Sequence, residues 1–260
     1  MATTTTTDGA DIHYETIGGG RDVVLVHGMS DSMRAWGPIP EMLAADNRVT
    51  TLDLRGHGES GDSSDYSATT MSLDVAAVVD AAGIDRPLVI GHSLGGVVVS
   101  MYAAQSAVRG VINVDQPLHL SGFQAGLREV APMLRDPATF TDVFAAIVDS
   151  LDGDLLPAEL EADIRRQRRP RQEVVLGVWN MVIDTPIDVL DAVIRDGVSP
   201  ITAPYLALMF VDAGPGYADW LHSVLPHALV EQWPSELGHY AHRLDPQRFV
   251  DTVKAFDPRD

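Results

Sequence analysis

The chain has 260 residues, a formal net charge of −19 and no cysteine. This length suits one large α/β domain, or one domain with an inserted subdomain, and the missing cysteine excludes disulfides, thiolate metal sites and a cysteine nucleophile. So acidic a surface repels phosphate backbones and anionic headgroups, and we therefore expect no nucleic-acid partner and no membrane-surface partner. The N-terminus has no secretory pattern and no stretch is long and apolar enough for a membrane span, which predicts a cytoplasmic protein. Only one of the 18 basic residues is a lysine, Lys254, which suggests GC-rich bacterial coding.

The first part of the chain alternates short apolar runs with amphipathic stretches, a pattern typical of βα units around a mostly parallel sheet. It opens with an expected antiparallel hairpin, residues 2–7 and 10–16, turned at Asp8-Gly9, a dipeptide that tolerates positive φ. In chain order, strands are then predicted at 23–26, 48–54, 87–90 and 111–114, and helices at 33–45, 70–82 and 97–106.

The pattern changes between about 117 and 200, where strand patterns are absent and helical spacing of apolar residues takes over. It then predicts a strand at 205–211, a helix near 216–225, a strand near 228–233 and a helix at 246–256. An α/β frame that is interrupted once and then resumed predicts one core domain, 1–116 and 201–260, with a helical cap inserted over 117–200.

The strongest chemical motif is Gly91-His92-Ser93-Leu94-Gly95, placed between an apolar strand and a helix. A serine on so sharp a turn presents its hydroxyl above the sheet, and flanking glycines are needed because a Cβ would collide with the strand or the helix. The alternative is a tight turn that merely contains a serine. A dinucleotide-binding loop is disfavoured because glycines at 91, 95 and 96 do not fit G-x-G-x-x-G. Ser93 is therefore predicted to be a nucleophile.

With this motif the chain resembles the α/β-hydrolase superfamily, over nearly its whole length except the cap. The matching stretches, in order, are residues 24–28 (VLVHG), 52–60 (LDLRGHGES), the serine motif and 237–239 (LGH). The resemblance implies an eight-stranded, mostly parallel sheet flanked by helices, a helical cap inserted after the sixth strand, and the chain order serine, acid, histidine. It implies no cofactor.

A serine hydroxyl needs a neighbouring imidazole to take its proton. His239 follows Gly238 in a loop after the last apolar run, where the family carries its general base. The pair His239-x-x-His242 could instead mimic two metal ligands on a helix, but no Glu stands between them and no third ligand is evident, so we expect no metal site.

Two aspartates compete for the acid that orients the imidazole. Asp212 follows the seventh expected strand, 27 residues before His239, an interval close to the family's usual one. The glycine that commonly precedes this acid is absent, which weakens the assignment. Some members carry the acid after the sixth strand, where Asp115 stands. We rank Asp212 first and keep Asp115 as the alternative.

The resemblance also assigns the oxyanion donors, the backbone N–H groups of Met29 and Leu94. His27 and His57 adjoin turns that border the expected site, and for both we favour a hydrogen-bonded structural role. The residues expected to surround the substrate are His27, Gly28, His92 and Trp179. The 55–60 loop is expected to be structural, with Arg55 paired to a carboxylate.

The cap carries a basic cluster in an acidic chain: Arg165, Arg166, Arg168, Arg169 and Arg171. It is either a receptor for a substrate carboxylate or a solvated helix end paired with Glu161, Asp163 and Glu173, and we favour the second.

The sequence thus predicts a serine hydrolase that cleaves an ester or lactone of a small to medium, mainly apolar substrate through an acyl-enzyme. A serine nucleophile disfavours the haloalkane dehalogenase and epoxide hydrolase branches, which use aspartate. The alternatives left open are a C–C bond hydrolase, a peracid-forming hydrolase, and a non-catalytic ligand-binding member of the fold. The oligomeric state is not predicted.

Overall fold

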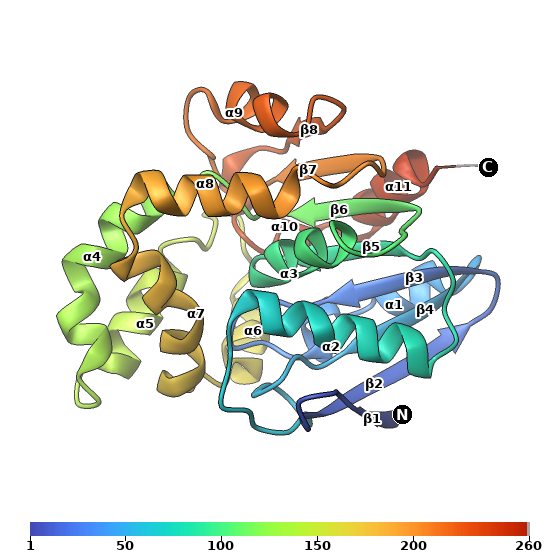
Figure 1. Cartoon of the computed structure of the whole chain (residues 1–260), viewed down its shortest axis with the longest axis horizontal. Helices are drawn as coiled ribbons and strands as arrows, with labels where there is room; N and C mark the ends of the chain where they lie inside the picture. Colours follow the sequence, from blue (N-terminus) through green and yellow to red (C-terminus); the bar gives the residue numbers. More distant parts are fainter. Residues whose placement is uncertain (259–260) are drawn as a thin grey trace.

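The computed structural model describes residues 1–258, whose strands form a single eight-stranded sheet in the order β1-β2-β4-β3-β5-β6-β7-β8 (Figure 1). The strands are β1 (Ala2–Thr5), β2 (Asp11–Gly18), β3 (Arg21–Val26), β4 (Asn47–Leu52), β5 (Leu88–His92), β6 (Gly110–Val114), β7 (Tyr205–Met209) and β8 (Leu229–Gln232). β2 pairs antiparallel with both β1 and β4, and the other neighbours are parallel. The predicted fold class is confirmed.

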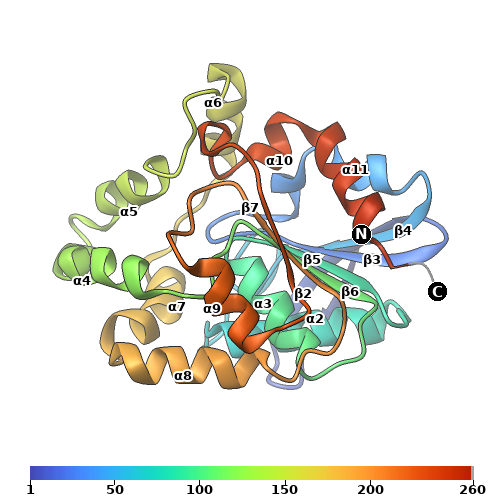
Figure 2. The same cartoon turned by 90° about the horizontal axis from the view of Figure 1, so that it is seen from above.

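The central strands are buried on both faces because helices cover both sides of the sheet. Side chains alternate along β3: Val24 and Val26 pack in one apolar cluster, and Val23 and Leu25 pack in the cluster on the opposite face. Figure 2 shows α2 and α3 on one side of the sheet and α11 on the other. The helices of the core are α1 (Ile39–Leu43), α2 (Ala68–Ala81), α3 (Leu94–Ala103), α9 (Tyr217–Val224), α10 (Ala241–Leu244) and α11 (Pro246–Phe256).

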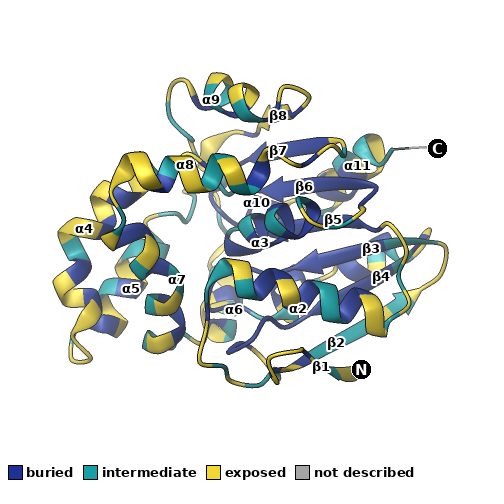
Figure 3. Ribbon diagram, viewed as in Figure 1, coloured by how far each residue is buried: buried dark blue, intermediate teal, exposed yellow. Residues whose placement is uncertain are grey.

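Between β6 and β7 the chain forms the helices that we call the cap. They are α4 (Ser121–Arg135), α5 (Phe140–Asp149), α6 (Ala158–Gln167), α7 (Gln172–Asp184) and α8 (Ile187–Val198). In Figure 1, α4, α5 and α7 stand beside the sheet, off the ends of its central strands. Figure 3 shows buried strands in the core, whereas the cap helices expose much of their outer surface.

One predicted helix, 33–45, is divided in the structure. A 3₁₀ helix, η1 (Met33–Trp36), is followed by the short helix α1, with Gly37 at φ 55° between them. Proline at position 38 lacks the N–H that a continuous helix would need, which explains the interruption.

Candidate active site

Ser93 lies at the turn between β5 and α3, in a backbone conformation that is rare for a residue with a side chain, φ 52° and ψ −125°. The two flanking glycines make the turn possible. A Cβ on Gly91 would lie 2.0 Å from Gly95 O, and one on Gly95 would lie 2.2 Å from Val26 O. Both contacts are with backbone, which cannot give way cheaply. The sequence therefore places a strained serine at the carboxyl end of a central strand, as the motif predicts.

The second group at this end of the sheet is a histidine–aspartate pair. His239 Nδ1–H donates a hydrogen bond to Asp115 Oδ2 at 2.6 Å. Asp115 directly follows β6, also at positive φ (55°), and its Oδ1 accepts from the backbone N–H groups of Phe210 (2.6 Å) and Val211 (2.9 Å). Since Nδ1 carries the proton in this bond, Nε2 of the neutral ring is left as a proton acceptor.

Asp212, ranked first from the sequence, does not reach the imidazole. Its side chain is exposed, and its Oδ1 accepts from the nearby Gly214 N–H (2.8 Å). The backbone after β7 turns away in the loop before α9, whereas Asp115 is held in place by two amides of that same loop. The order of the two candidates is therefore reversed, and Asp115 is the carboxylate beside His239.

The two expected oxyanion donors flank the serine. Leu94 is the first residue of α3, so its N–H lies at the positive end of the helix dipole. Met29 follows Gly28, where a Cβ would lie 3.1 Å from Ser93 Cβ. Neither the Met29 nor the Leu94 N–H donates to a loop or side-chain acceptor in the described part of the chain. Both amides thus remain available to an oxygen at Ser93.

His27, for which a structural role was favoured, and His92 are both buried. His27 donates from Nδ1 to Gly28 O (2.8 Å) and accepts at Nε2 from Leu54 N–H (3.1 Å), which uses both ring nitrogens. His92 Nε2–H donates to His239 O at 2.9 Å, so it supports the loop that carries His239. Burial lowers the pKa of His27 to about 4 and holds the pKa of His92 well below its usual value. Both rings are neutral, and they hold the backbone in position.

His57 and His242 are likewise buried and neutral. His57 donates from Nδ1 to Arg55 O (2.9 Å), and burial lowers its pKa to about 3. His242 packs between Trp36 and Phe249, with ring centroids 5.4 and 5.7 Å away. Among residues 1–258, no three His, Cys, Asp or Glu side chains come together as a metal-binding group.

The sequence did not indicate a polar cluster beside the serine. Tyr240 OH donates to Asp31 Oδ2 (3.0 Å), and the Arg168 guanidinium stands 5.3 Å from the centre of the Tyr240 ring. Burial raises the pKa of Asp31. A Cβ on Gly28 would lie 3.3 Å from Asp31 Oδ2, so this carboxyl adjoins the turn. Two features of the sequence could have indicated this cluster. Asp31 lies three residues after Gly28, and Tyr240 directly follows His239.

The cap holds the histidine loop directly. His239 N–H donates to Leu151 O (2.9 Å), and Asp152 forms an antiparallel bridge with Gly238. The position of the imidazole therefore depends on a cap segment that no sequence motif marks.

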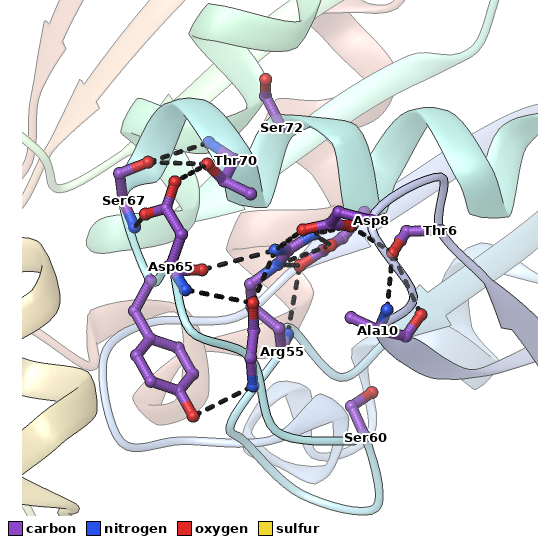
Figure 4. Close-up of polar contacts among 12 residues, drawn as sticks. Thr6, Asp8, Ala10, Arg55, Ser60, Asp65, Ser67, Thr70 and Ser72 are labelled. Carbon is purple, nitrogen blue, oxygen red and sulfur yellow. Dashed lines mark hydrogen bonds and ion pairs between the residues drawn. The ribbon is translucent and has the colours of Figure 1, made fainter.

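The predicted structural role of Arg55 agrees with its contacts, drawn in Figure 4. Its buried guanidinium donates to Asp74 (2.6 and 2.9 Å), to Asp8 (2.6 Å), to Ser63 Oγ and to the backbone of Asp65. All three of its side-chain nitrogens have acceptors, so the group is bound within the fold.

The remaining cap residues divide between packing and ion pairs. Trp179, expected near the substrate, packs between Phe123 and Phe144 (centroids 5.7 and 5.6 Å) and is 8% exposed. Of the cap arginines, three pair with the carboxylates named from the sequence: Arg165 with Glu161, Arg166 with Asp163 and Arg171 with Glu173.

Comparison with known proteins identifies the family of this chain. Residues 23–190 match the model of the α/β-hydrolase fold, and the chain belongs to this family. Of its described helices, none combines the length and the apolar character required to cross a bilayer.

Several proteins to which the chain is similar are named as hydrolases. The chain is 26% identical over 252 residues to the sn-1-specific diacylglycerol lipase ABHD11 of Mus musculus, covering 90% of this chain and 80% of the lipase. A shorter match, 38% identical over 117 residues, covers 44% of this chain and 44% of RutD of Azorhizobium caulinodans. The esterase RhEst1 of Rhodococcus sp. has a similar structure, with a TM-score of 0.72, 26% identity, and coverage of 98% of this chain and 97% of RhEst1. Est816, described as an N-acyl homoserine lactone degrading enzyme, has a TM-score of 0.78 at 22% identity over 98% of this chain and 100% of its own.

Proposed function

We propose that this chain is a serine hydrolase that cleaves an ester or lactone of a small to medium, mainly apolar acid through an acyl-enzyme. The observation that carries the proposal is the convergence of Ser93, on a strained turn, with the hydrogen-bonded pair of His239 and Asp115 at the same end of the sheet. Serine, imidazole and carboxylate are the three groups that acyl transfer requires.

In the proposed mechanism Ser93 Oγ attacks the carbonyl carbon while His239 Nε2 takes its proton. Asp115 keeps the imidazole in the tautomer with Nδ1 protonated, and it stabilises the imidazolium that forms. The N–H groups of Met29 and Leu94 bind the developing oxyanion. His239 then gives its proton to the leaving oxygen. In the second half-reaction it activates the water that releases the acid.

The bond type is supported by what the relatives are named for: an esterase, a lipase, and an enzyme that degrades N-acyl homoserine lactones. Carboxylic esters and lactones both present an electrophilic carbonyl carbon to the nucleophile, so one site can hydrolyse both. The net charge of −19 disfavours anionic substrates around the site, which supports a preference for neutral ones.

The test uses a fluorophosphonate probe together with p-nitrophenyl esters of increasing chain length and a series of lactones. We expect labelling at Ser93, detected by mass spectrometry, and turnover that falls by about 10⁴-fold or more in Ser93→Ala. Ser121→Ala, an exposed serine at the start of α4, is the matched control and should keep full activity. Absence of labelling, with no turnover above that of Ser93→Ala, would favour the non-catalytic alternative.

A further inference from the structure

A cavity of about 540 Å³ lies between the end of the cap helix α6, the turn that contains η1, and the loop after β4. Its lining includes neither Ser93 nor His239, Asp115, Met29 or Leu94. None of these five residues is part of its wall, although Asp31, which adjoins the serine turn, is. Its cap wall is joined to the core because Arg169 N–H donates to Ser30 O at 2.8 Å.

Four of the residues that line this cavity are arginines. Arg34, Arg166, Arg169 and Arg171 line it, although the whole chain has only 18 basic residues. Arg166 and Arg171 form ion pairs with carboxylates. Arg34 and Arg169, both exposed, pair with no carboxylate within residues 1–258. Arg169 donates only from Nη1, to the carbonyl groups of Arg166 and Arg168, which leaves its Nε and Nη2 without an acceptor there.

Three carboxylates, those of Asp31, Asp53 and Glu59, line the same cavity, and none of them forms an ion pair with Arg34 or Arg169 within residues 1–258. Both oxygens of Asp53 are occupied, since Oδ1 accepts from Met33 N–H (2.7 Å) and Oδ2 from Glu59 N–H (2.9 Å). Asp31 accepts from Tyr240 OH, and burial raises its pKa, which disfavours its charged form. Only Glu59 presents an exposed carboxylate. The cavity thus has guanidinium donors without acceptors, in a protein that otherwise carries a large excess of negative charge.

We propose that this cavity binds a small dicarboxylate anion, at a site separate from Ser93. A guanidinium offers a planar pair of N–H donors that matches a carboxylate, and two arginines without partners can bind two such groups. The volume is within the range of pockets for small organic ligands. The proposal does not depend on the hydrolase function.

The experiment is calorimetric titration of the full chain with succinate, with acetate and inorganic phosphate as separate arms. We expect saturable succinate binding with Kd below about 1 mM, and a loss of at least about tenfold in affinity in the double variant Arg34→Gln/Arg169→Gln. Arg135→Gln, which removes an exposed cap arginine paired with Asp184, is the matched control and should bind as the parent does. Circular dichroism checks that each variant is folded.

Three outcomes would overturn the proposal: no saturable succinate binding, equal binding by the double variant, or binding of phosphate without succinate. The titration is repeated on protein modified by the fluorophosphonate. Unchanged succinate binding supports a separate site, and its loss would assign the anion to Ser93 instead. If the probe does not label, the proposed hydrolase function fails while the arginine variants still decide the anion site.

Discussion

Two polar clusters lie at the carboxyl ends of strands of the same sheet, and they differ in how far their hydrogen-bonding capacity is used. After β4, the Arg55 guanidinium has acceptors for all three of its nitrogens, from Asp8, Asp74 and loop groups. After β5 and β6, Ser93 and Asp115 hold positive φ angles, and the Ser93 hydroxyl has no hydrogen-bond partner within residues 1–258.

This difference distinguishes a cluster whose bonds all lie within the fold from one that can still bind another molecule. A buried charge with every donor satisfied has no capacity left for a ligand, and removing its partner destabilises the fold. Holding a serine in a strained backbone conformation costs free energy, and the two backbone amides beside it lack acceptors. Such an arrangement is retained where a bound molecule can supply the missing hydrogen-bond partners. The two clusters should therefore respond to mutation in opposite ways, one in stability and the other in turnover.

The largest expected effect is on the acid. Asp115→Asn should lower kcat by about 10⁴-fold, because an amide favours the wrong imidazole tautomer and cannot stabilise the imidazolium. Asp212→Asn, its matched control, should stay within about twofold, since that side chain is exposed. The measurement is steady-state hydrolysis of the best p-nitrophenyl ester. If the loss fell on Asp212→Asn instead, Asp115 would be a structural carboxylate like Asp74.

A smaller effect, on stability, is expected at the saturated cluster. Arg55→Met leaves Asp74 buried without its partner and should lower the free energy of unfolding by about 3–5 kcal/mol. The kcat per folded molecule should change little, because Arg55 does not contact the serine turn. Urea unfolding measures the first quantity and active-site titration with the fluorophosphonate normalises the second. Arg135→Met, which breaks an exposed pair, should cost less than about 1 kcal/mol. A folded Arg55→Met protein with a collapsed kcat would remove the contrast between the clusters.

The smallest effect concerns the neutral histidines that join the two regions. Burial lowers the pKa of His27 to about 4 and of His57 to about 3, whereas the unfolded chain takes up these protons near pH 6.5. The contribution of these neutral rings to the free energy of unfolding is therefore fully present above pH 6.5. It is lost as the pH falls from 6.5 toward the folded-state pKa, and at pH 5 the loss is about 2 kcal/mol for each ring. Urea unfolding at pH 7.5 and pH 5 checks this, and His57→Gln should reduce the loss by about 2 kcal/mol. An equal loss in that variant would assign acid sensitivity to other groups.

The sequence predicted most of the frame and part of the site. Continuous apolar runs identified the central strands because residues buried on both faces leave a strong local pattern, and the glycines around Ser93 identified the turn because only glycine fits there. The division of the 33–45 helix at Gly37-Pro38 was visible in the residues but was outweighed by the helical spacing around it.

The acid could not be chosen in the same way. Asp115 and Asp212 both follow strands at the same end of the sheet, and spacing along the chain does not report which side chain turns toward an imidazole that is 124 or 27 residues away. The choice depends on the loop after β7, whose amides hold Asp115 and whose path carries Asp212 outward. The packing of Trp179 and His92 could not be predicted for a similar reason, since spacing along the chain does not show which neighbours enclose a side chain.

The absence of cysteine excluded thiol chemistry. Local patterns then predicted the central strands and the serine turn, and the resemblance to the α/β-hydrolase superfamily indicated the candidate base. These are short-range properties, because strand periodicity and steric fit at a turn depend on residues close in the chain. Only the tertiary structure decided which carboxylate meets His239, that a cap segment holds the histidine loop, and that Arg34 of the core and Arg169 of the cap line one cavity. Each of these is a contact between segments far apart in sequence, and its geometry is set by packing rather than by any local pattern.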